Sequence, residues 1–187
     1  MTVVASNFAP VANHFYQTEP WATEVLLRHF PIAGLTVWEP AAGGHLMADA
    51  LKAGGGEVWT SDIAGYGRLH DFPGLDFFAK NLPLPSGCDA IITNPPYGKG
   101  NRMAVRFTEL ALERCDGMVA LLLTAKFDFG KTRRHLFQDS PRFMAKIALL
   151  DRISWAGNGE TGTEDHAWYV WGPTGQQRQP LMLWGAK

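Results

Sequence analysis

The sequence has little of what stabilises secreted, metal-binding or membrane proteins. Its two cysteines, Cys88 and Cys115, lie in unrelated segments without CxxC spacing, which argues against a disulfide framework or a zinc site. No apolar run approaches the roughly 20 residues of a membrane-spanning helix. The N-terminus has neither a basic start followed by an apolar core nor a cleavage site. We therefore expect a cytoplasmic protein with reduced thiols that does not enter a membrane.

A strong charge bias is also missing. The net charge of −1 and the pI near 6.6 argue against a protein held to nucleic acid by bulk charge, although they do not exclude a local basic face. With 46% hydrophobic residues, the 187-residue chain is long enough for one domain with a substantial core and too short for two ordinary domains. We expect a single domain over residues 1–187, with residues 1–33 as an N-terminal segment and residues 34–187 as the core.

Short apolar runs alternate with amphipathic stretches along the chain. The predicted strands cover residues 35–39, 57–63, 89–93, 118–124, 147–155 and 167–171. The predicted helices cover residues 19–30, with Thr18 as the cap, residues 45–53 and residues 101–114. A strand, a small-residue turn and a helix open a βαβ unit at residue 35. This alternation predicts an α/β domain built on a parallel sheet.

The most specific stretch is Asn94-Pro95-Pro96-Tyr97, which follows a buried-strand pattern. Each proline has φ fixed at about −65° and lacks an N–H, so the loop is stiff and the carbonyl groups of Asn94 and Pro95 are free to face a ligand. The Asn94 side-chain oxygen and a rigid main-chain carbonyl can each accept one hydrogen of an aryl amine, which favours a pyramidal nitrogen. Tyr97 supplies a flat face for a base. The alternative is a Pro-Pro turn capped by the asparagine.

A turn of small residues, Pro40-Ala41-Ala42-Gly43-Gly44, joins the first predicted strand to a helix. Small residues let the backbone approach a ligand, and the free N–H groups of the helix N-terminus favour an anion such as a carboxylate. The turn lacks the GxGxxG pattern of dinucleotide-binding proteins. Asp62 closes the second predicted strand, about twenty residues past the turn, where ribose hydroxyls are held in such folds. The alternative for Asp62 is a helix or turn cap.

Asn94-Pro95-Pro96-Tyr97 resembles the catalytic tetrad of the class I S-adenosylmethionine-dependent amino-methyltransferases. These enzymes methylate the exocyclic amine of adenine in nucleic acid or the side-chain amide of glutamine in proteins. The resemblance implies a Rossmann-like α/β fold, in which a seven-stranded, mostly parallel sheet ends in an antiparallel edge hairpin and carries helices on both faces. It further implies a small form without a separate target-recognition domain, which methylates N6 of adenine in nucleic acid, DNA rather than RNA, with S-adenosylmethionine as the methyl donor. A partner protein would then supply target specificity.

Two other interpretations stay open. A protein glutamine N5-methyltransferase uses the same tetrad, but its family usually carries an N-terminal helical substrate domain, and only about thirty residues precede the first predicted strand here. The other is a catalytically silent scaffold that binds nucleic acid or a partner methyltransferase, which the intact tetrad disfavours. The sequence has no Pro-Cys nucleophile, so methylation of carbon is disfavoured.

The resemblance also assigns cofactor-binding residues. Residues 1–33 would cover the methionine end of the cofactor, and acids at the ends of the second and third strands would hold its ribose and adenine. The residues so assigned are Tyr16, Thr18, Glu39, Ala41, Gly43, Asp62, Ile63, Asp76, Phe77 and Asn94. Asp76 is preferred to Asp71 because its distance ahead of the tetrad is closer to the family's spacing. On the residues alone, residues 16–20 fit the start of a capped surface helix equally well.

His45 stands where the family commonly has glycine, so the turn is expected to differ locally there. Basic side chains gather after the tetrad and within residues 125–146, where phenylalanines are interleaved with them. This pattern predicts a nucleic-acid surface that contains Lys99, Arg102, Lys126, Lys131, Arg133 and Arg134. The alternative is a solvated helix whose aromatic residues face the core.

Overall fold

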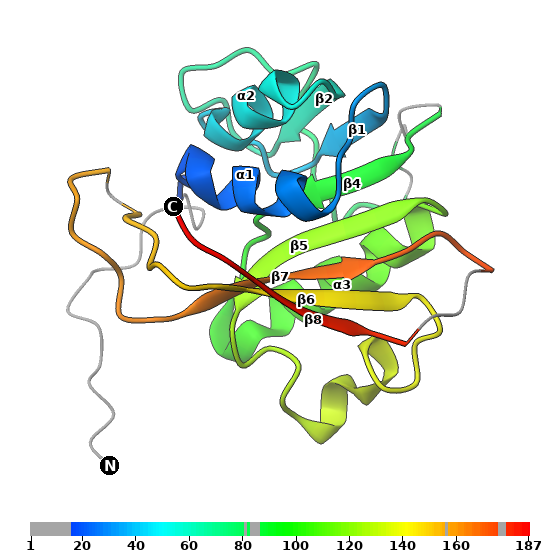
Figure 1. The fold of residues 1–187 in the computed structure, drawn as a ribbon. Coiled ribbons are helices and arrows are strands. Elements are labelled where there is room, and N and C mark those ends of the chain that lie inside the picture. The colour runs from blue at the N-terminus through cyan, green and yellow to red at the C-terminus, as the bar shows by residue number, and fades with distance from the viewer. Residues whose placement is uncertain (1–15, 81, 83–86, 156, 176–178) are drawn as a thin grey trace.

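The computed structural model describes residues 16–80, 82, 87–155, 157–175 and 179–187. Within these ranges, an eight-stranded sheet has the order β3-β2-β1-β4-β5-β7-β6-β8 (Figure 1). Its strands are β1 Thr36–Glu39, β2 Glu57–Asp62, β3 Phe72–Pro73, β4 Ala90–Thr93, β5 Met118–Thr124, β6 Phe143–Leu149, β7 His166–Trp171 and β8 Leu181–Gly185. The α-helices are α1 Pro20–His29, α2 Leu46–Ala53 and α3 Arg102–Arg114, and the 3₁₀ helices are η2 Lys99–Asn101 and η3 Lys131–Leu136.

The first five strands form a parallel sheet. β1 pairs with β2 and β4, β2 pairs with β3, and β4 pairs with β5, all in parallel. β7 then inserts antiparallel between β5 and β6, and β8 runs parallel to β6. β4 and β7 are buried along their whole length, as expected of strands that are covered on both faces.

Helices cover both faces of the sheet, as predicted (Figure 1). α1 and α2 pack on one face, where Leu26 and Leu51 join Ile92 in a buried cluster. α3 packs on the other face, where Phe107 joins Ile91. Ile91 and Ile92 are neighbours in β4 and enter different clusters because successive strand residues point to opposite faces. None of the described helices is long and apolar enough to cross a membrane.

The sheet has one strand more than the seven predicted. β8 lies beyond the last predicted strand and pairs with β6, so the β6–β7 hairpin is not the edge of the sheet. The predicted strand over residues 147–155 is also displaced, because β6 ends at Leu149. The signal for β8 is weak, since its apolar run is short, follows Pro180 and does not alternate with polar residues. Its apolar side chains are mostly exposed, with Trp184 at 57%.

α1 begins as predicted, with Pro20 in its first turn, but Thr18 is not its cap. The N-cap is Glu19, whose side chain makes no hydrogen bond to the helix N–H groups. Thr18 is instead buried, with 4% of its surface exposed. Thr18 therefore faces the interior of the protein rather than solvent.

The residues around β8 hold α1 in place. His29 Nε2 lies 3.1 Å from the carbonyl oxygen of Trp184, and Arg28 donates to the carbonyl oxygen of Ala186. Figure 1 shows the C-terminal end of the chain beside the first turn of α1. The first helix and the last strand thus support each other, although most of the chain separates them in sequence.

Candidate active site

A cavity of about 560 Å³ opens where β1, β2 and β4 end, at the carboxyl edge of the parallel strands. Its size lies within the ~300–1,000 Å³ that is typical of small-molecule sites. All ten residues predicted to bind the cofactor line this cavity, together with Pro96 of the tetrad. The remaining lining, whose residues were not among these ten, consists of Gln17, Pro40, Ala42, Gly44, Leu46, Met47, Tyr66, Leu75, Phe78, Met103 and Phe107.

Contacts with β2 fix the turn after β1. Ala42 N donates to Ser61 O at 3.0 Å, and Gly43 N donates to Oδ2 of Asp62 at 2.9 Å. A Cβ at Gly44 would lie 2.2 Å from Oε1 of Gln17, so a side chain there would displace the Gln17 side chain. The small residues of the turn therefore allow residues 16–18 to approach it closely.

His45 adopts the left-handed conformation that favours glycine, with φ of 71°. The backbone thus accommodates the histidine without the local change that the sequence suggested. The strain of such a conformation, about 1–3 kcal/mol, persists only where the surroundings hold it. Here the His45 ring is buried, with 4% exposed, and does not line the cavity.

A hydrogen-bonded pair of histidines supplies that support. His45 Nε2 lies 2.8 Å from Nδ1 of His70, and His70 Nε2 lies 3.1 Å from Ala64 O. Because a carbonyl oxygen only accepts, His70 donates through Nε2 and, when neutral, accepts at Nδ1 from His45. Burial lowers the pKa of His45, and the neighbouring His70 and Arg68 lower it further. The two rings therefore tie the turn after β1 to the loop after β2.

Glu39, the last residue of β1, is buried at 2% exposure and lines the cavity. Its Oε2 has no hydrogen-bond partner among the described residues. Burial raises the pKa of this carboxyl well above its usual value, and the charges of Asp62 and Asp49 raise it further. A buried carboxyl oxygen without a partner is costly unless a ligand satisfies it. The cavity therefore suits a ligand with a hydrogen-bond donor or a positive charge at this end, and the ammonium group of S-adenosylmethionine meets that requirement.

Asp62, at the end of β2, is buried at the cavity wall. Its two oxygens accept hydrogen bonds from Gly43 N at 2.9 Å and Ala64 N at 3.0 Å. These bonds fix the orientation of the carboxylate and leave it further lone pairs. Asp62 can thus accept hydroxyl donors from a ligand while it holds the turn.

Asp76 lines the cavity, whereas Asp71 does not. Asp76 is exposed and accepts a hydrogen bond from Phe78 N at 2.9 Å. Asp71 accepts from N and Oγ1 of Thr60, at 2.8 and 2.9 Å, and so connects β2 to the segment that leads into β3. Asp76 is therefore within reach of a ligand in the cavity, whereas Asp71 has a structural role.

Asn94 follows β4 directly and is half-buried at the cavity wall. Its Nδ2 donates to the carbonyl oxygen of Tyr16 at 3.3 Å. The carbonyl oxygen of Tyr97 accepts from Met103 N at 3.1 Å and Ala104 N at 3.3 Å. The tetrad is therefore held on one side by the segment before α1 and on the other by the first turn of α3.

Tyr97 lies outside the cavity wall, in an aromatic group beside it. Its hydroxyl donates to Leu122 O at 3.2 Å, and burial raises its pKa, so the phenol stays neutral. The Tyr97 ring lies 6.3 Å from that of His166, with an interplanar angle of 24°. Trp155 makes edge contacts with His166 at 4.9 Å and with Tyr16 at 6.0 Å. Rings from four separate segments thus meet next to the tetrad.

The sequence assigned no role to His166, because nothing near it in the chain marks it. Its position follows only from the antiparallel insertion of β7 beside β5. Burial lowers its pKa to about 4, so the imidazole is neutral at physiological pH. Its Nδ1 is buried and has no hydrogen-bond partner among the described residues.

The aromatic residues of the segment 125–146 lie mostly in the core. Phe127 and Phe137 are buried, Phe143 is half-buried, and Phe129 is 69% exposed. The segment folds into η3 and the start of β6 rather than into a long solvated helix. Its interleaved pattern therefore reflects core packing at three of these four positions, and the predicted aromatic surface is reduced to Phe129.

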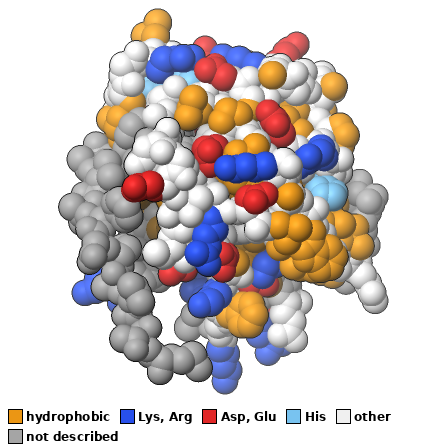
Figure 2. Space-filling model, turned by 60° about the vertical axis from the view of Figure 1, so that its left-hand side comes forward, with side chains coloured by type: hydrophobic (Ala, Val, Ile, Leu, Met, Phe, Trp, Pro, Cys, Tyr) orange, Lys and Arg blue, Asp and Glu red, His pale blue; other side chains and the backbone are white. Residues whose placement is uncertain are grey.

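Two of the six predicted phosphate-binding residues are engaged within the protein. Arg133 donates from Nε to Phe127 O at 2.6 Å and from a second nitrogen to Phe129 O. Arg134 pairs with Asp139 at 2.9 Å. On the visible part of the face in Figure 2, acidic and basic side chains are interspersed rather than separated. The predicted residues that are exposed and form no ion pair among the described residues are Lys99, Arg102, Lys126 and Lys131.

No family model matches the sequence, and no curated protein matches it significantly. The fold does match solved structures. The methyltransferase subunit of a type I restriction-modification system from Streptococcus thermophilus superposes with a TM-score of 0.64 at 13% identity, over 91% of this chain and 47% of that chain.

Two further solved structures match the fold of this chain. A methyltransferase from Pyrococcus furiosus matches with a TM-score of 0.53 at 16% identity over 82% of both chains. TrmN from Thermus thermophilus matches with a TM-score of 0.54 at 21% identity, over 82% of this chain and 48% of that chain. The chain thus spans about half the length of the Streptococcus subunit and of TrmN. At these identities the likeness concerns the fold alone: the chain has the Rossmann-like fold of class I methyltransferases.

Proposed function

We propose that this protein is an S-adenosylmethionine-dependent methyltransferase that acts on the exocyclic N6 amine of adenine in nucleic acid, in DNA rather than RNA. One observation carries the proposal. Segments that are far apart in the sequence bring the ten predicted cofactor-binding residues and Pro96 of the tetrad to a single cavity at the carboxyl edge of the sheet. This edge is where open α/β sheets bind their ligands.

The lining suits the parts of S-adenosylmethionine, which when bound supplies a methyl group activated by a positively charged sulfur. Glu39 has an unpaired buried oxygen for the ammonium group. Asp62 has unused lone pairs for ribose hydroxyls. Asp76 lies further along the wall, next to Phe77, where a carboxylate and a ring suit an adenine with an exocyclic amine.

The tetrad suits a target amine that enters from the other side of Asn94. Its Nδ2 is committed to Tyr16 O, so Oδ1 is the amide atom left to accept a hydrogen from the target. Together with a main-chain carbonyl of the Pro-Pro turn, it would stabilise the positive charge that develops on the amine during transfer. Tyr97 would hold the base through its ring, because its hydroxyl is buried on Leu122 O and its raised pKa rules it out as a base near neutral pH.

The preference for DNA rests on the likeness to a restriction-modification methyltransferase subunit and stays a proposal. The exposed side chains of Lys99, Arg102, Lys126 and Lys131 would contact phosphates, which position a nucleic acid without reading its sequence.

The test is mass spectrometry of nucleosides from DNA and from RNA, each incubated with the protein and S-adenosylmethionine labelled in its methyl group. We expect labelled N6-methyladenosine derivatives, in DNA above RNA, and none with Asn94→Ala. Label on a glutamine side chain of a protein substrate instead would overturn the proposed target. A protein that binds the cofactor tightly and labels neither class would overturn the enzymatic function.

A further inference from the structure

Residues 16–19, which we name the strap, contact both halves of the site. Gln17 packs against Gly44 of the turn after β1 so closely that a Cβ at Gly44 would lie 2.2 Å from its Oε1. Tyr16 O accepts from Nδ2 of Asn94 at 3.3 Å. The strap therefore connects the cofactor side of the cavity to the catalytic tetrad.

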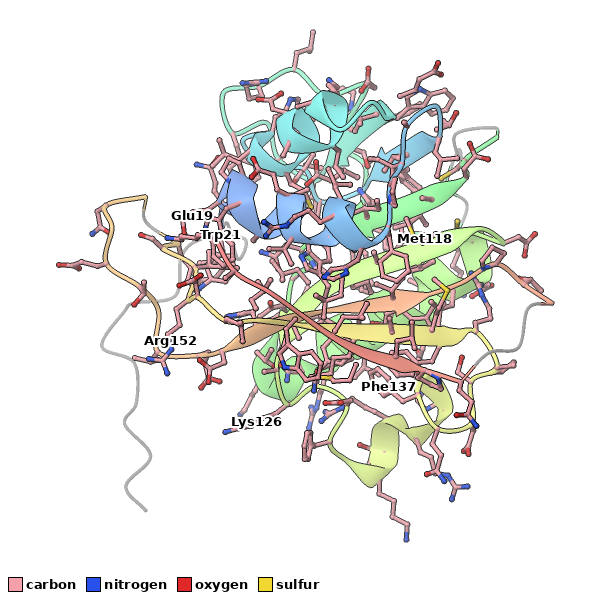
Figure 3. The ribbon with its side chains drawn as sticks, in the orientation of Figure 1. Glu19, Trp21, Met118, Lys126, Phe137 and Arg152 are labelled. Carbon is pink, nitrogen blue, oxygen red and sulfur yellow. The ribbon has the colours of Figure 1, made fainter. Side chains whose placement is uncertain are left out.

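Glu19 anchors the strap to the loop after β6. Its Oε2 accepts from Ser154 N at 2.7 Å and from Nε1 of Trp21 at 3.0 Å, and its Oε1 lies 3.7 Å from Nζ of Lys187. Figure 3 shows Glu19 and Trp21 together at the start of α1. Burial would raise the pKa of Glu19, but these donors outweigh burial and lower it, so the carboxylate is ionised at neutral pH. Hydrogen bonds to an ionised acceptor are among the strong ones.

The anchor reaches the tetrad through a short piece of chain. Only Gln17 and Thr18 lie between Tyr16 and Glu19, so the Tyr16 carbonyl can lie at most about 10 Å from Glu19. A carbonyl oxygen only accepts, so it selects the Nδ2 end of the Asn94 amide and turns Oδ1 toward the remaining space. The anchored loop also carries Trp155, whose ring contacts Tyr16 at 6.0 Å. One carboxylate thus fixes both the carbonyl that orients Asn94 and a ring beside the tetrad.

We propose that Glu19 is a positioning residue for methyl transfer: it clamps the strap to the loop after β6, and the strap's Tyr16 carbonyl holds the Asn94 amide with Oδ1 toward the methyl-accepting amine. This inference rests on the proposed function. In this proposal the strap orients the Asn94 amide in addition to covering the cofactor. This orientation affects the rate, because misplacement of a group by about 1 Å can cost about 100-fold.

The kinetic test compares Glu19→Ala, the conservative Glu19→Gln and the control Glu24→Ala, which removes an exposed glutamate from the same helix. At a temperature where circular dichroism shows all variants folded, we expect Glu19→Ala to lower the single-turnover rate by about tenfold to 100-fold at saturating DNA and cofactor. Cofactor Kd should change by less than about threefold, Glu19→Gln should recover part of the rate, and Glu24→Ala should match the wild type. Equal losses of rate and cofactor affinity would overturn the proposal.

A second readout does not need activity. In protein with ¹⁵N-labelled asparagine, the Asn94 side-chain signal is assigned by its loss in Asn94→Asp, and its hydrogen exchange is followed by NMR with cofactor present. We expect slow exchange in the wild type and Glu24→Ala, and exchange at least about tenfold faster in Glu19→Ala. Unchanged exchange in Glu19→Ala would overturn the positioning role. If the wild type methylates no nucleic acid, the proposed function fails, and this measurement still decides whether Glu19 orients the amide.

Discussion

Asn94 is the residue at which binding of the methyl donor and transfer of the methyl group should separate. In the proposed function Oδ1 accepts a hydrogen of the target amine, so Asn94→Ala should lower turnover by at least about 100-fold, the usual effect of removing a group that stabilises transition-state charge. Cofactor affinity should change only a few-fold. Calorimetry with S-adenosylmethionine and incorporation of labelled methyl groups measure the two effects. A proportional loss of both would show that Asn94 serves mainly as part of the cofactor wall.

Glu39 should limit the stability of the ligand-free protein. A carboxyl whose pKa is raised by folding contributes stability that is complete below the unfolded pKa and lost as pH rises through the folded pKa. Glu39→Gln should therefore raise the melting temperature at about pH 8, with little effect at about pH 4, where the carboxyl is already protonated. The same change should weaken cofactor binding by about tenfold or more, since it removes a charged acceptor.

Glu57→Gln is the matched control for Glu39→Gln, because Glu57 is exposed at the start of the neighbouring strand. Glu57→Gln should alter neither the melting temperature nor cofactor binding. A lower melting temperature for Glu39→Gln at about pH 8 would mean that the carboxyl has a partner that stabilises the empty cavity.

Substitutions of Asp62, Asp71 and Asp76 should have different effects, because these carboxylates contact different groups. Asp62→Asn and Asp76→Asn should each weaken cofactor binding by about tenfold or more, because each removes a charged acceptor from the cavity wall. Asp71→Asn should leave affinity nearly unchanged and lower the melting temperature, since Thr60 loses its ionised partner. Calorimetry and thermal unfolding of the three variants decide this. Weaker binding with Asp71→Asn alone would move the adenine contact to Asp71.

At this scale, the residues predicted to bind the cofactor could be placed together at one cavity from the sequence, because most of them follow a predicted strand. The rest of the site could not. Met103 and Phe107 reach the cavity wall only through the way α3 packs. His166 contacts Tyr97, and Trp155 contacts His166, only because β7 inserts between β5 and β6. Such neighbours are set by tertiary packing, and local sequence carries no signal for them.

At the level of the elements, the segment 125–146 shows that one pattern of basic and aromatic residues is compatible with either a nucleic-acid surface or internal packing. Lys126 and Lys131 point to solvent, whereas Arg133 caps two carbonyl groups of its own loop. The double variant Lys126→Glu/Lys131→Glu should lower the slope of log affinity against log salt by roughly one for each phosphate that is no longer neutralised, with an unchanged melting temperature.

Arg133→Ala is the counterpart of this double variant. It should lower the melting temperature, because two carbonyl oxygens lose a charged donor, and leave the salt slope nearly unchanged. Titrations of labelled DNA at several salt concentrations, with thermal unfolding alongside, measure both effects. A flatter salt slope for Arg133→Ala at unchanged stability would return Arg133 to the nucleic-acid surface.

Apart from β3, which is two residues long and which no apolar run marks, the order of helices and strands up to β7 could be read from the sequence, since apolar runs, glycine turns and prolines mark those boundaries. β8 escaped because an edge strand needs only one apolar face and its pairing partner is distant in sequence. Leu183 packs against the core, whereas Trp184 is 57% exposed, so no alternation of apolar and polar residues announces the strand.

For the whole molecule, the contacts between α1 and β8 mean that α1 cannot complete its packing until β8 has been synthesised. Arg28 and Ala186 are 158 residues apart, and His29 and Trp184 are 155 apart. A ribosome adds about 5–20 residues per second, so β8 is synthesised roughly 8 to 30 s after α1. The turn after β1 is complete long before that, yet the strap beside it has neither Ser154 nor Lys187 to bind during most of this interval.

We therefore expect the turn after β1 to form early in synthesis, and the strap to be fully held only after Ser154 and Lys187 have been made. The measurement compares two ribosome-stalled chains. One carries residues up to 175 and the other residues up to 187, and in each a flexible linker follows so that these residues lie outside the exit tunnel. Limited proteolysis should cut the strap in the shorter chain and spare it in the longer one. Equal protection would mean that the strap docks without β8. With the expected result, β8, which does not line the cavity, controls through its support of α1 when during synthesis the strap becomes ordered.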